Sequence, residues 1–461
     1  MKEIVNLKSR TNASKDNSTL LNITRIETDF SKVDEFTKIK HSFLGKIYQN
    51  YCKPLPAVRR LVIFGWRVLY PLSIQVKRSL LRSTKSRKFK LVGLNEYMEK
   101  NKCQFSTYSL DTYIDTPVPR VFPERKRSNL FDPTRKRRFN CPPTFKTRIP
   151  NATVVGGTNI TFVQSDAIHH DLYDFRLDYT SEELHQRHTL RIKNRSLIIN
   201  KYDSDPYRLS CGASFLDACS HNYAHWITEV LSRIVVFCSS SDAYNIPLLV
   251  DDGLHDNIID SIFHVAGPDR QVILVPQGKS VLVDDLYLTS VCGYVPFERR
   301  QRKTPSSSEG IFSPLSFSLL VQNLIPKISH GNIERYPDRI YIKRNSKIRS
   351  LVNASEIENS LIANGYFVFE PERYTFLEQV AFFNQAKVIV GGSGAAMANL
   401  IFCDEKAVIK IMISEDPETS YWYWQNIACA SGKEIQYILG RRVGTARGVH
   451  ADFYLDPRLL V

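Results

Sequence analysis

The sequence lacks the usual marks of an extracellular or membrane-spanning protein. None of its nine cysteines belongs to a CxxC pair, and the odd number argues against a full disulfide framework. Residues 1–10 contain no long apolar run and no small-residue cleavage site, so no signal peptide is predicted. The apolar stretch within residues 58–78 is shorter than the roughly 20 residues of a spanning helix, and Arg67 and Pro71 interrupt it. These absences favour a cytoplasmic protein.

Acidic residues are fewer than basic residues in this sequence. The chain has 62 Lys and Arg against 47 Asp and Glu, a formal charge of +15 that implies a polyanionic neighbour. Much of the excess lies in residues 125–127 and 135–138, where a solvated linker would explain it equally well. No aromatic platform is interleaved with these charges and no zinc or helix-turn-helix signature is present, so no nucleic acid is expected as a partner.

The order of signals along the chain predicts two α/β domains behind a basic N-terminal region. Residues 1–45 are polar and weakly periodic, which predicts disorder. Residues 46–150 form a basic extension that reads as loop from about Leu91 to Pro150. Within it, residues 58–78 fit an interfacial helix in peripheral contact with an anionic membrane, or equally a helix packed on the protein's own core. Strand and helix signals then alternate over residues 151–330 and 331–461.

Individual elements are expected in both α/β regions. In the first, the predicted elements are strands at 152–155, 196–199, 246–250 and 271–275 and a helix at 256–266 that ends at Gly267. In the second, strands are predicted at 339–342 and 366–370. Two helices there begin after Asn353 and Thr375, since each of these capping residues is followed three positions later by Glu.

A glycine-rich turn is the most distinctive stretch of the second region. An apolar run ends in Gly391-Gly392-Ser393-Gly394, and helix-favouring residues follow directly. Glycines let the backbone approach a phosphate, and the amides of a first helical turn favour anions. Many parallel sheets need such a turn for structural reasons alone, so the turn does not by itself predict a phosphate site.

The segment from His221 to Arg233 offers a candidate catalytic pair. On a helix, His225 and Glu229 are four residues apart and share a face. A carboxylate that fixes the tautomer of a histidine supports its action as a general base. Two alternatives stay open: an ordinary ion pair from Glu229 to Arg233, or a metal site made by His221, His225 and Glu229, although no HExxH spacing is present.

Cations gather where the predicted strand 339–342 ends. Lys343 and Arg344 follow the strand directly, and Arg349 lies just beyond them. The carboxyl ends of strands are where open α/β sheets bind ligands, and the planar guanidinium of arginine suits a diphosphate. A solvated basic loop is the alternative.

Taken in order, these motifs resemble the family-61 glycosyltransferases. The resemblance covers about residues 150–460 and rests on four stretches, which are Asn222-Tyr-Ala-His225-Trp226 with Glu229, Lys343-Arg344 through Arg349 and Asn353, Glu378-Gln379, and Gly391 to Asn399. It implies a GT-B-like α/β fold with two Rossmann-like domains facing a cleft. It also implies an inverting transfer from a nucleotide-sugar to a hydroxyl of a glycan or lipid-linked glycan, as in bacterial capsular polysaccharide biosynthesis.

The resemblance also assigns roles to residues. His225 and Glu229 would be catalytic, and no metal or cofactor would be needed. The donor would be bound by Lys343, Arg344, Arg349, Gly392, Ser393, Gly394, Ala395 and Asn399. The sequence departs from the family pattern at Ser393, where histidine is usual, at Lys343, where arginine is usual, and at Lys410, where a strand often ends in glutamate. A catalytically inactive relative that binds glycans or assembly partners is therefore the alternative function.

Overall fold

The computed structural model describes residues 5–6, 22–26, 87–123, 137–173, 189–193, 196–199, 206–295, 310–328, 336–345, 349–416, 419, 421–446, 448 and 451–460. The predicted interfacial helix at 58–78 and the basic cluster at 125–127 lie outside these residues, as does most of the segment predicted to be disordered. In the described part of the chain, no helix is long and apolar enough to cross a membrane.

The first half of the molecule is built on a thirteen-stranded sheet. Four parallel strands form its centre in the order β15-β14-β13-β16, which in chain order reads 3-2-1-4, as in the first four strands of a Rossmann sheet. They are β13 (Tyr207–Ser214), β14 (Leu248–Asp251), β15 (Val272–Val275) and β16 (Ser280–Thr289). All residues of β14 and β15 are buried, as expected for strands covered on both faces.

Further strands extend this sheet on both sides. Beyond β15 lie β2 (Ile23–Arg25) and β1 (Val5–Asn6). Beyond β16 lie β8 (Thr144–Val155), β9 (Thr161–Val163), β10 (Asp166–His169), β3 (Arg87–Gly93), β12 (Ser196–Ile199) and β11 (Thr189–Lys193), while β4 (Phe105–Ser109) also pairs with β8. The helices of this half are α4 (Leu94–Asn101), α5 (Tyr223–His225), the π-helix η5 (Trp226–Leu231), α6 (Ser232–Cys238), η6 (Ser241–Ala243), α7 (Asp256–Ala266), α8 (Pro314–Leu324) and η7 (Ile325–Lys327).

The second half is built on a seven-stranded sheet. Five of its parallel strands lie in the order β20-β19-β21-β22-β23, which reads 2-1-3-4-5 along the chain. These are β19 (Arg339–Ile342), β20 (Phe367–Phe369), β21 (Val388–Gly392), β22 (Val408–Ser414) and β23 (Ile435–Val443), with β24 (Asp452–Tyr454) and β6 (Arg120–Phe122) both paired to β23. Its helices are α9 (Ala354–Ala363), η9 (Pro371–Arg373), α10 (Phe376–Gln385), η10 (Ala395–Phe402), α11 (Trp422–Ala430) and η12 (Pro457–Leu459).

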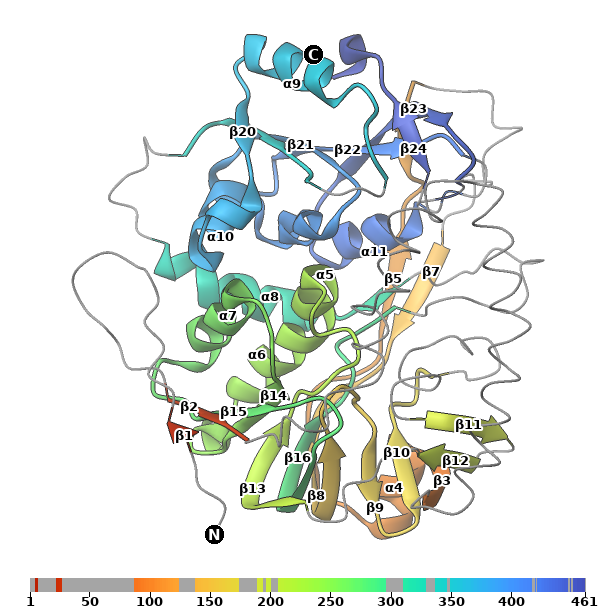
Figure 1. The fold of residues 1–461 in the computed structure, drawn as a ribbon, viewed down its shortest axis with the longest axis vertical. Coiled ribbons are helices and arrows are strands. Elements are labelled where there is room, and N and C mark those ends of the chain that lie inside the picture. The colour runs from red at the N-terminus through yellow and green to blue at the C-terminus, as the bar shows by residue number, and fades with distance from the viewer. Residues whose placement is uncertain are drawn as a thin grey trace, which may run out of the picture.

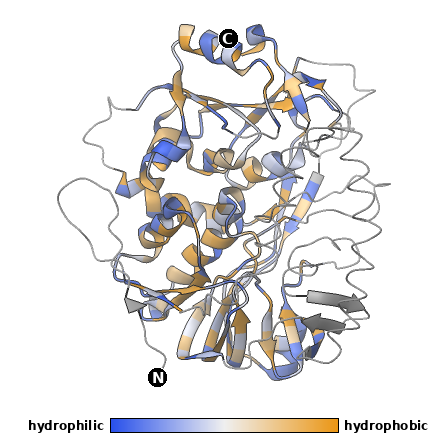
Figure 2. Cartoon of the chain, in the orientation of Figure 1, coloured by the Kyte–Doolittle hydropathy of each residue, from blue (hydrophilic) through white to orange (hydrophobic). Residues whose placement is uncertain are grey.

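Helices fill the space between the two sheets (Figure 1). The first sheet lies at one end, followed by the layer with α5, α6, α7 and α8, then the layer with α10 and α11, and then the second sheet, with α9 on its far face. One hydrophobic core runs through both helical layers, and it includes Trp226 and Ile227 of η5 together with Phe376 and Phe383 of α10. Figure 2 shows the same helices rich in hydrophobic residues. The two halves are thus joined by shared apolar packing.

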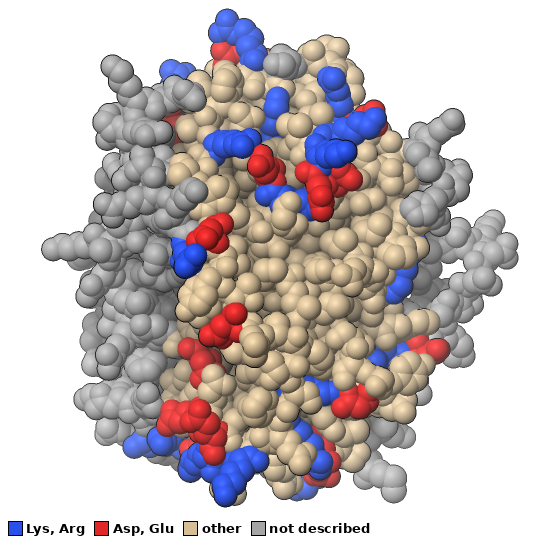
Figure 3. Space-filling model, turned by 180° about the vertical axis from the view of Figure 1, so that it is seen from behind, with Lys and Arg blue, Asp and Glu red and all other residues tan. Residues whose placement is uncertain are grey.

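Two small sheets complete the molecule. The strand β5 (Thr112–Thr116) pairs with β7 (Arg137–Cys141), and β17 (Gly293–Tyr294) pairs with β18 (Ile311–Phe312). On the face of the molecule drawn in Figure 3, Lys and Arg lie beside Asp and Glu near both ends, and the middle is mostly uncharged. Where the structure describes residues on this face, the positive charge of the chain is therefore not gathered into one patch.

The mixed α/β class predicted from the sequence is confirmed, and most predicted elements are present. The helix 256–266 and the strands 196–199 and 339–342 have the predicted limits. Thr375 forms the expected capping box with Glu378, whereas the Asn353 side chain makes no cap bond and instead donates to Leu455 O at 2.7 Å. The predicted domain limits near residues 45, 150 and 330 stay predictions.

The expectation of a loop from about Leu91 to Pro150 is wrong where the structure describes this segment. It contains β4 to β8, and β8 pairs with β16 from Ser280 to Thr289. The strand β6 pairs with β23 of the other sheet. Pro117, Pro119 and Pro123 lie between strands, not inside them. The strands β16 and β23, which pair with β8 and β6, lie more than one hundred residues away, and local composition does not report such pairing.

Candidate active site

A binding crevice begins where β19 and β21 end. These strands are neighbours, but the chain leaves β19 toward β20 on one side and β21 toward β22 on the other. Such a switch point opens a crevice at the carboxyl ends of the strands. Ile342 lies beside Gly391 in the sheet, so Arg344 and the glycine-rich turn both follow the sheet edge at the same place. The sequence placed both features at strand ends without showing that the ends are adjacent.

Two arginines converge on a single carbonyl of the glycine-rich turn. Arg344 Nη1 and Arg349 Nη1 both donate to the backbone oxygen of Ser393, the second at 3.4 Å. Gly394 permits this approach, because a Cβ on it would lie 2.7 Å from Arg344 Nη1. Arg349 adopts a left-handed backbone with φ of 60°, which is uncommon for a residue other than glycine. The backbone is thus strained at one of the two cations.

The electrostatics of this pair favour an anionic ligand. Burial, together with the neighbouring charge of Arg349, lowers the pKa of Arg344 to about 10. Burial also lowers the pKa of Arg349. Among the described residues, the buried Nε of Arg349 has no hydrogen-bond acceptor. A bound anion would relieve the repulsion between the two cations and accept from the unused N–H.

A cavity of about 440 Å³ lies in front of the arginines, within the size range of small-ligand sites. Residues of both halves line it. The second half contributes Ile342, Lys343, Arg344, Asn345, Arg349, Pro371, Glu372, Gln379, Gly392, Gly394, Ala395 and Ala396, and the first half contributes His221, Tyr223, His255, Asn257 and Ile258. The cavity therefore collects six of the eight residues that the sequence assigned to donor binding.

The other two residues have structural partners. The Ser393 hydroxyl accepts from Trp424 Nε1 at 2.9 Å. Asn399 is fully buried, where its Oδ1 accepts from Tyr223 OH at 2.7 Å and its Nδ2 donates to Gln379 Oε1 at 3.2 Å. Ser393 and Asn399 thus shape the site without lining the cavity.

Two lysines also have carboxylate or carbonyl partners. Lys343 lines the cavity, and its ammonium forms an ion pair with Glu358 at 3.0 Å. Lys410 lies in the middle of β22 and donates to the carbonyl of Leu460 at 3.0 Å. The expectation that β22 ends near Lys410 is wrong, because the strand continues to Ser414 and Glu415 follows it. A carboxylate does stand after this strand, five residues later than the sequence comparison placed it.

The glycine-rich turn continues into η10, which is a 3-10 helix where an ordinary helix was expected. The amide of Met397 donates to Gly394 O at 2.9 Å, the three-residue spacing of this helix type. Every residue from Met397 to Phe402 is buried. The segment is packed on all sides where it winds into the tighter 3-10 form. Local helix propensity in the sequence does not report this packing.

His225 and Glu229 are brought together as predicted. The pair follows β13, the strand at the 3-2-1-4 switch point of the first sheet, and Asn222 caps the segment by accepting from Ala224 N at 3.0 Å. His225 Nδ1 forms a short hydrogen bond with Glu229 Oε1, and each side chain is only 11% exposed. Burial raises the pKa of Glu229, and His225 opposes this rise. When Glu229 is ionised it can only accept, so Nδ1 donates, and in the neutral imidazole Nε2 then keeps a lone pair.

The alternative interpretations of this segment do not fit the geometry. Arg233 does not reach the Glu229 carboxylate: its Nη2 pairs with Asp217 at 3.2 Å and its Nε donates to the Glu229 carbonyl at 3.1 Å. Within the described ranges, no group of three or more His, Cys, Asp or Glu side chains is arranged to hold a metal ion. The triad of His221, His225 and Glu229 therefore does not form a ligand set.

A buried carboxylate supports the loop before this segment. Asp251, at the end of β14, accepts from Gly157 N at 2.6 Å and from Asp217 N at 2.9 Å. Burial raises the pKa of Asp251 to about 7, and these hydrogen bonds limit the rise. Asp251 thereby fixes Asp217, the partner of Arg233.

Sequence motifs did not single out the residues that connect the pair of His225 and Glu229 to the cavity. His225 and Glu229 do not line the cavity, whereas His221 and Tyr223 on the same segment do. Tyr423 of α11 is hydrogen-bonded to Thr228 and lies within electrostatic reach of both Glu229 and Arg349. Its only signal in the sequence is a run of four aromatic residues from 421 to 424, which reads as core.

Comparison with known proteins covers this part of the chain. Residues 223–410 match the family model described as Glycosyltransferase 61. A search of curated proteins found no match. The matched range begins at the first residue of α5 and ends in β22, so it contains the His225 pair, both arginines and the glycine-rich turn. The resemblance read from the sequence is confirmed by this match to the glycosyltransferase 61 family model over residues 223–410.

Proposed function

We propose that the protein is an inverting glycosyltransferase with a GT-B-like arrangement, in which a nucleotide-sugar lies in the cavity between the two halves. The observation that supports this most is the convergence of Arg344 and Arg349 on one carbonyl at the cavity wall. This arrangement offers guanidinium N–H groups to a diphosphate at a strand switch point. The family match supports sugar transfer in general.

The proposed reaction is a single displacement. His225 Nε2 takes the proton of an acceptor hydroxyl, while Glu229 holds the imidazole and balances its charge. The acceptor oxygen forms a bond to the anomeric carbon as the bond from that carbon to the phosphate oxygen breaks, which inverts the configuration. The electron pair stays on the departing diphosphate, and the arginines and the amides at the start of η10 stabilise the charge. No metal or cofactor takes part in this proposal.

The proposed acceptor is a hydroxyl of a glycan or a lipid-linked glycan, in the biosynthesis of a polysaccharide such as a capsule. The proposed location is the cytoplasm, with peripheral contact to the inner face of an anionic membrane. The net charge of +15 supports this contact, because basic segments are attracted to anionic lipid.

Binding of nucleoside diphosphates tests the proposal directly. Calorimetric titration of uridine, guanosine, adenosine and cytidine diphosphates should find at least one that binds the wild-type protein. Arg344→Ala and Arg349→Ala should each weaken that binding by roughly 10- to 100-fold, the value of one charged hydrogen bond. Arg458→Ala is the matched control, because Arg458 is 88% exposed and pairs with Asp456 away from the cavity lining.

Two results would contradict the proposal. Binding of no nucleoside diphosphate and no nucleotide-sugar would favour the inactive relative. Binding that both arginine variants leave unchanged would place the donor elsewhere. With a donor identified, His225→Ala should abolish transfer and leave donor binding intact, and the anomeric configuration of the product should be opposite to that of the donor.

A further inference from the structure

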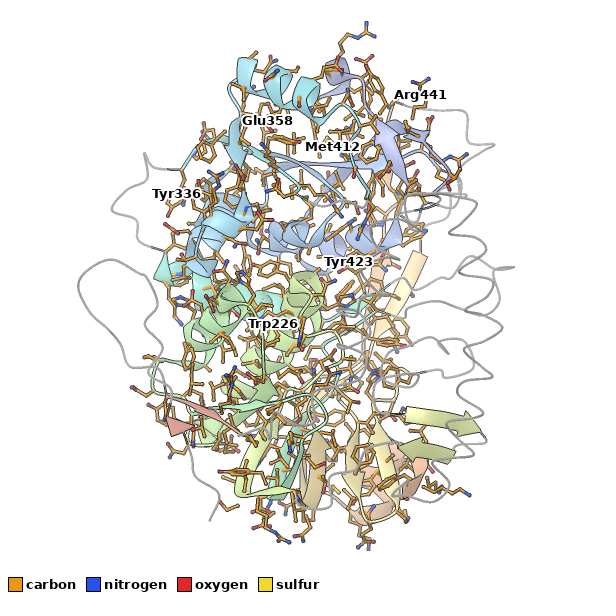
Figure 4. All side chains as sticks on the ribbon, viewed as in Figure 1. Trp226, Tyr336, Glu358, Met412, Tyr423 and Arg441 are labelled. Atoms are coloured by element: carbon orange, nitrogen blue, oxygen red, sulfur yellow. The ribbon has the colours of Figure 1, made fainter. Side chains whose placement is uncertain are left out.

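Tyr423 lies where the two halves of the site meet. It belongs to the first turn of α11, and Figure 4 shows it in the helical layers between the sheets. Its ring packs edge-on against Phe312 with centroids 5.9 Å apart and against Trp424 at 4.6 Å. Phe312 belongs to β18, which pairs with β17 beside η5. The ring is thus held in place by packing that does not depend on its hydroxyl.

The hydroxyl of Tyr423 reaches the helix that bears the catalytic pair. It is hydrogen-bonded to the side chain of Thr228. The Thr228 hydroxyl donates its own proton to the carbonyl of Ala224 at 2.8 Å, so the phenol is the donor to Thr228 Oγ1. Ala224 precedes His225, and Thr228 precedes Glu229. The chain of two hydrogen bonds therefore fixes the turn on which His225 and Glu229 meet.

The same hydroxyl is close to charges of both halves. Burial raises the pKa of Tyr423 strongly, and the Glu229 charge adds to this, whereas the Arg349 charge opposes it. The phenol consequently stays protonated and remains a donor over the physiological pH range. A neutral donor at this position satisfies Thr228 without adding charge beside either Glu229 or Arg349.

The next residue of α11 binds the other side of the site. Trp424 Nε1 donates to the Ser393 hydroxyl at 2.9 Å, and the Ser393 carbonyl receives both arginines. Tyr423 and Trp424 are consecutive residues of one helical turn. They thus contact the helix that bears His225 on one side and, on the other, the group formed by Arg344, Arg349 and the Ser393 carbonyl, which we call the arginine cradle. The start of α11 fixes the distance between the base and the leaving-group site.

We propose that Tyr423 is a positioning residue for sugar transfer, which aligns the His225 pair with the arginine cradle through its hydrogen bond to Thr228. This inference rests on the proposed function. It assigns Tyr423 no contact with either substrate: its effect passes through Thr228 and the backbone of η5.

Three variants test the inference. Tyr423→Phe removes the hydroxyl and keeps the ring packing, and Thr228→Val removes the acceptor. Tyr421→Phe is the matched control, since Tyr421 is a buried tyrosine beside the same helix whose hydroxyl has no hydrogen-bond partner in the described part of the chain. Circular dichroism and thermal unfolding establish that each variant is folded.

Two measurements then separate a positioning role from a structural one. In proton NMR, the His225 proton shared with Glu229 should give a far-downfield signal, assigned by its loss in His225→Gln. This signal should shift or broaden in Tyr423→Phe and stay unchanged in Tyr421→Phe. In turnover assays, Tyr423→Phe should lower kcat roughly 10- to 100-fold, the cost of a small misplacement, with nucleoside diphosphate binding within twofold of wild type.

The outcomes are distinguishable. If Tyr423→Phe leaves both the downfield signal and kcat at wild-type values, the inference is wrong. In the double variant Tyr423→Phe/Thr228→Val, the fold-decrease in kcat should be smaller than the product of the two single-variant fold-decreases, because a shared hydrogen bond can be lost only once. A decrease equal to that product would show that the two residues act independently, and the inference would also be wrong. If no donor supports turnover, the proposed function fails, and the NMR signal alone decides whether Tyr423 positions the pair.

Discussion

Asn399 gives the sharpest test of whether a family-pattern residue binds substrate or holds the fold. The structure surrounds it with two partners of opposite halves. Tyr223 OH donates to its Oδ1 at 2.7 Å, and its Nδ2 donates to Gln379 Oε1 at 3.2 Å. Gln379 cannot turn its amide away at no cost, because its own Nε2 donates to Pro371 O and Tyr374 O. Substitution of Asn399 by alanine therefore strands two buried polar groups.

The expected loss of stability follows from these two polar groups. A buried donor or acceptor that loses its partner costs about 1–3 kcal/mol, so Asn399→Ala should lower the free energy of unfolding by about 2–6 kcal/mol. Tyr223→Phe removes one of the two bonds and should cost about 1–3 kcal/mol. Asn364→Ala is the control: Asn364 is exposed at the end of α9, and its substitution should cost less than about 1 kcal/mol.

Equilibrium unfolding in guanidinium chloride, followed by the fluorescence of the four tryptophans, measures these losses. Nucleoside diphosphate binding to the folded Asn399→Ala variant should stay within twofold of wild type, because Asn399 does not line the cavity. The opposite pattern, unchanged unfolding together with lost nucleotide binding, would show that Asn399 contacts the donor and that the buried link is not its main role.

Three further substitutions probe the site and its support. Gly394→Ala should weaken nucleoside diphosphate binding at least tenfold in calorimetry, because the added Cβ would lie 2.7 Å from Arg344 Nη1 and displace it; wild-type affinity would refute the close approach. Asp251→Asn should remove a pH dependence of stability. Burial raises the pKa of Asp251 to about 7, so the folded protein keeps a proton that the unfolded chain releases from about pH 4, and stability should fall by up to about 1.4 kcal/mol per unit as pH rises through this range in wild type only. Unfolding measured from pH 4 to 8 checks this, and equal slopes would contradict it. Lys410→Met should leave donor binding unchanged, since Lys410 contacts Leu460 and does not line the cavity; a large loss of affinity would reverse this assignment.

Elements with strong local signals could be predicted from the sequence. The helix 256–266 shows a periodic apolar face and a terminal glycine, and its limits are correct. Strands such as 339–342 are short apolar runs with cations at their ends. The pairing of His225 with Glu229 follows from helical spacing alone, and the structure confirms it. In each case the information lies within a few residues of the feature.

Features that depend on tertiary contacts could not be predicted. The strands β6 and β8 lie in a segment that reads as loop, because their partners β23 and β16 are distant in sequence. Helical spacing left an ion pair of Arg233 with Glu229 open as an alternative, yet Arg233 lies against Asp217, which the loop after β13 brings to it. The role of Tyr423 depends on α11 reaching η5 across the molecule. The spacing of residue types along the sequence does not indicate which distant residues come into contact in the fold.

The arginine cradle shows why the described site is built for a ligand. Arg344 and Arg349 are partly buried side by side, and burial lowers the pKa of each. One carbonyl oxygen accepts from both, which satisfies N–H groups but supplies no full negative charge. Desolvated like charges cost free energy, and a left-handed backbone at Arg349 adds strain. A diphosphate would supply negative charge and offset the repulsion between the two cations, and its charge grows as the sugar leaves. Under the proposed function, the cradle would therefore bind the departing group more strongly than the intact donor, which is the condition for accelerating transfer.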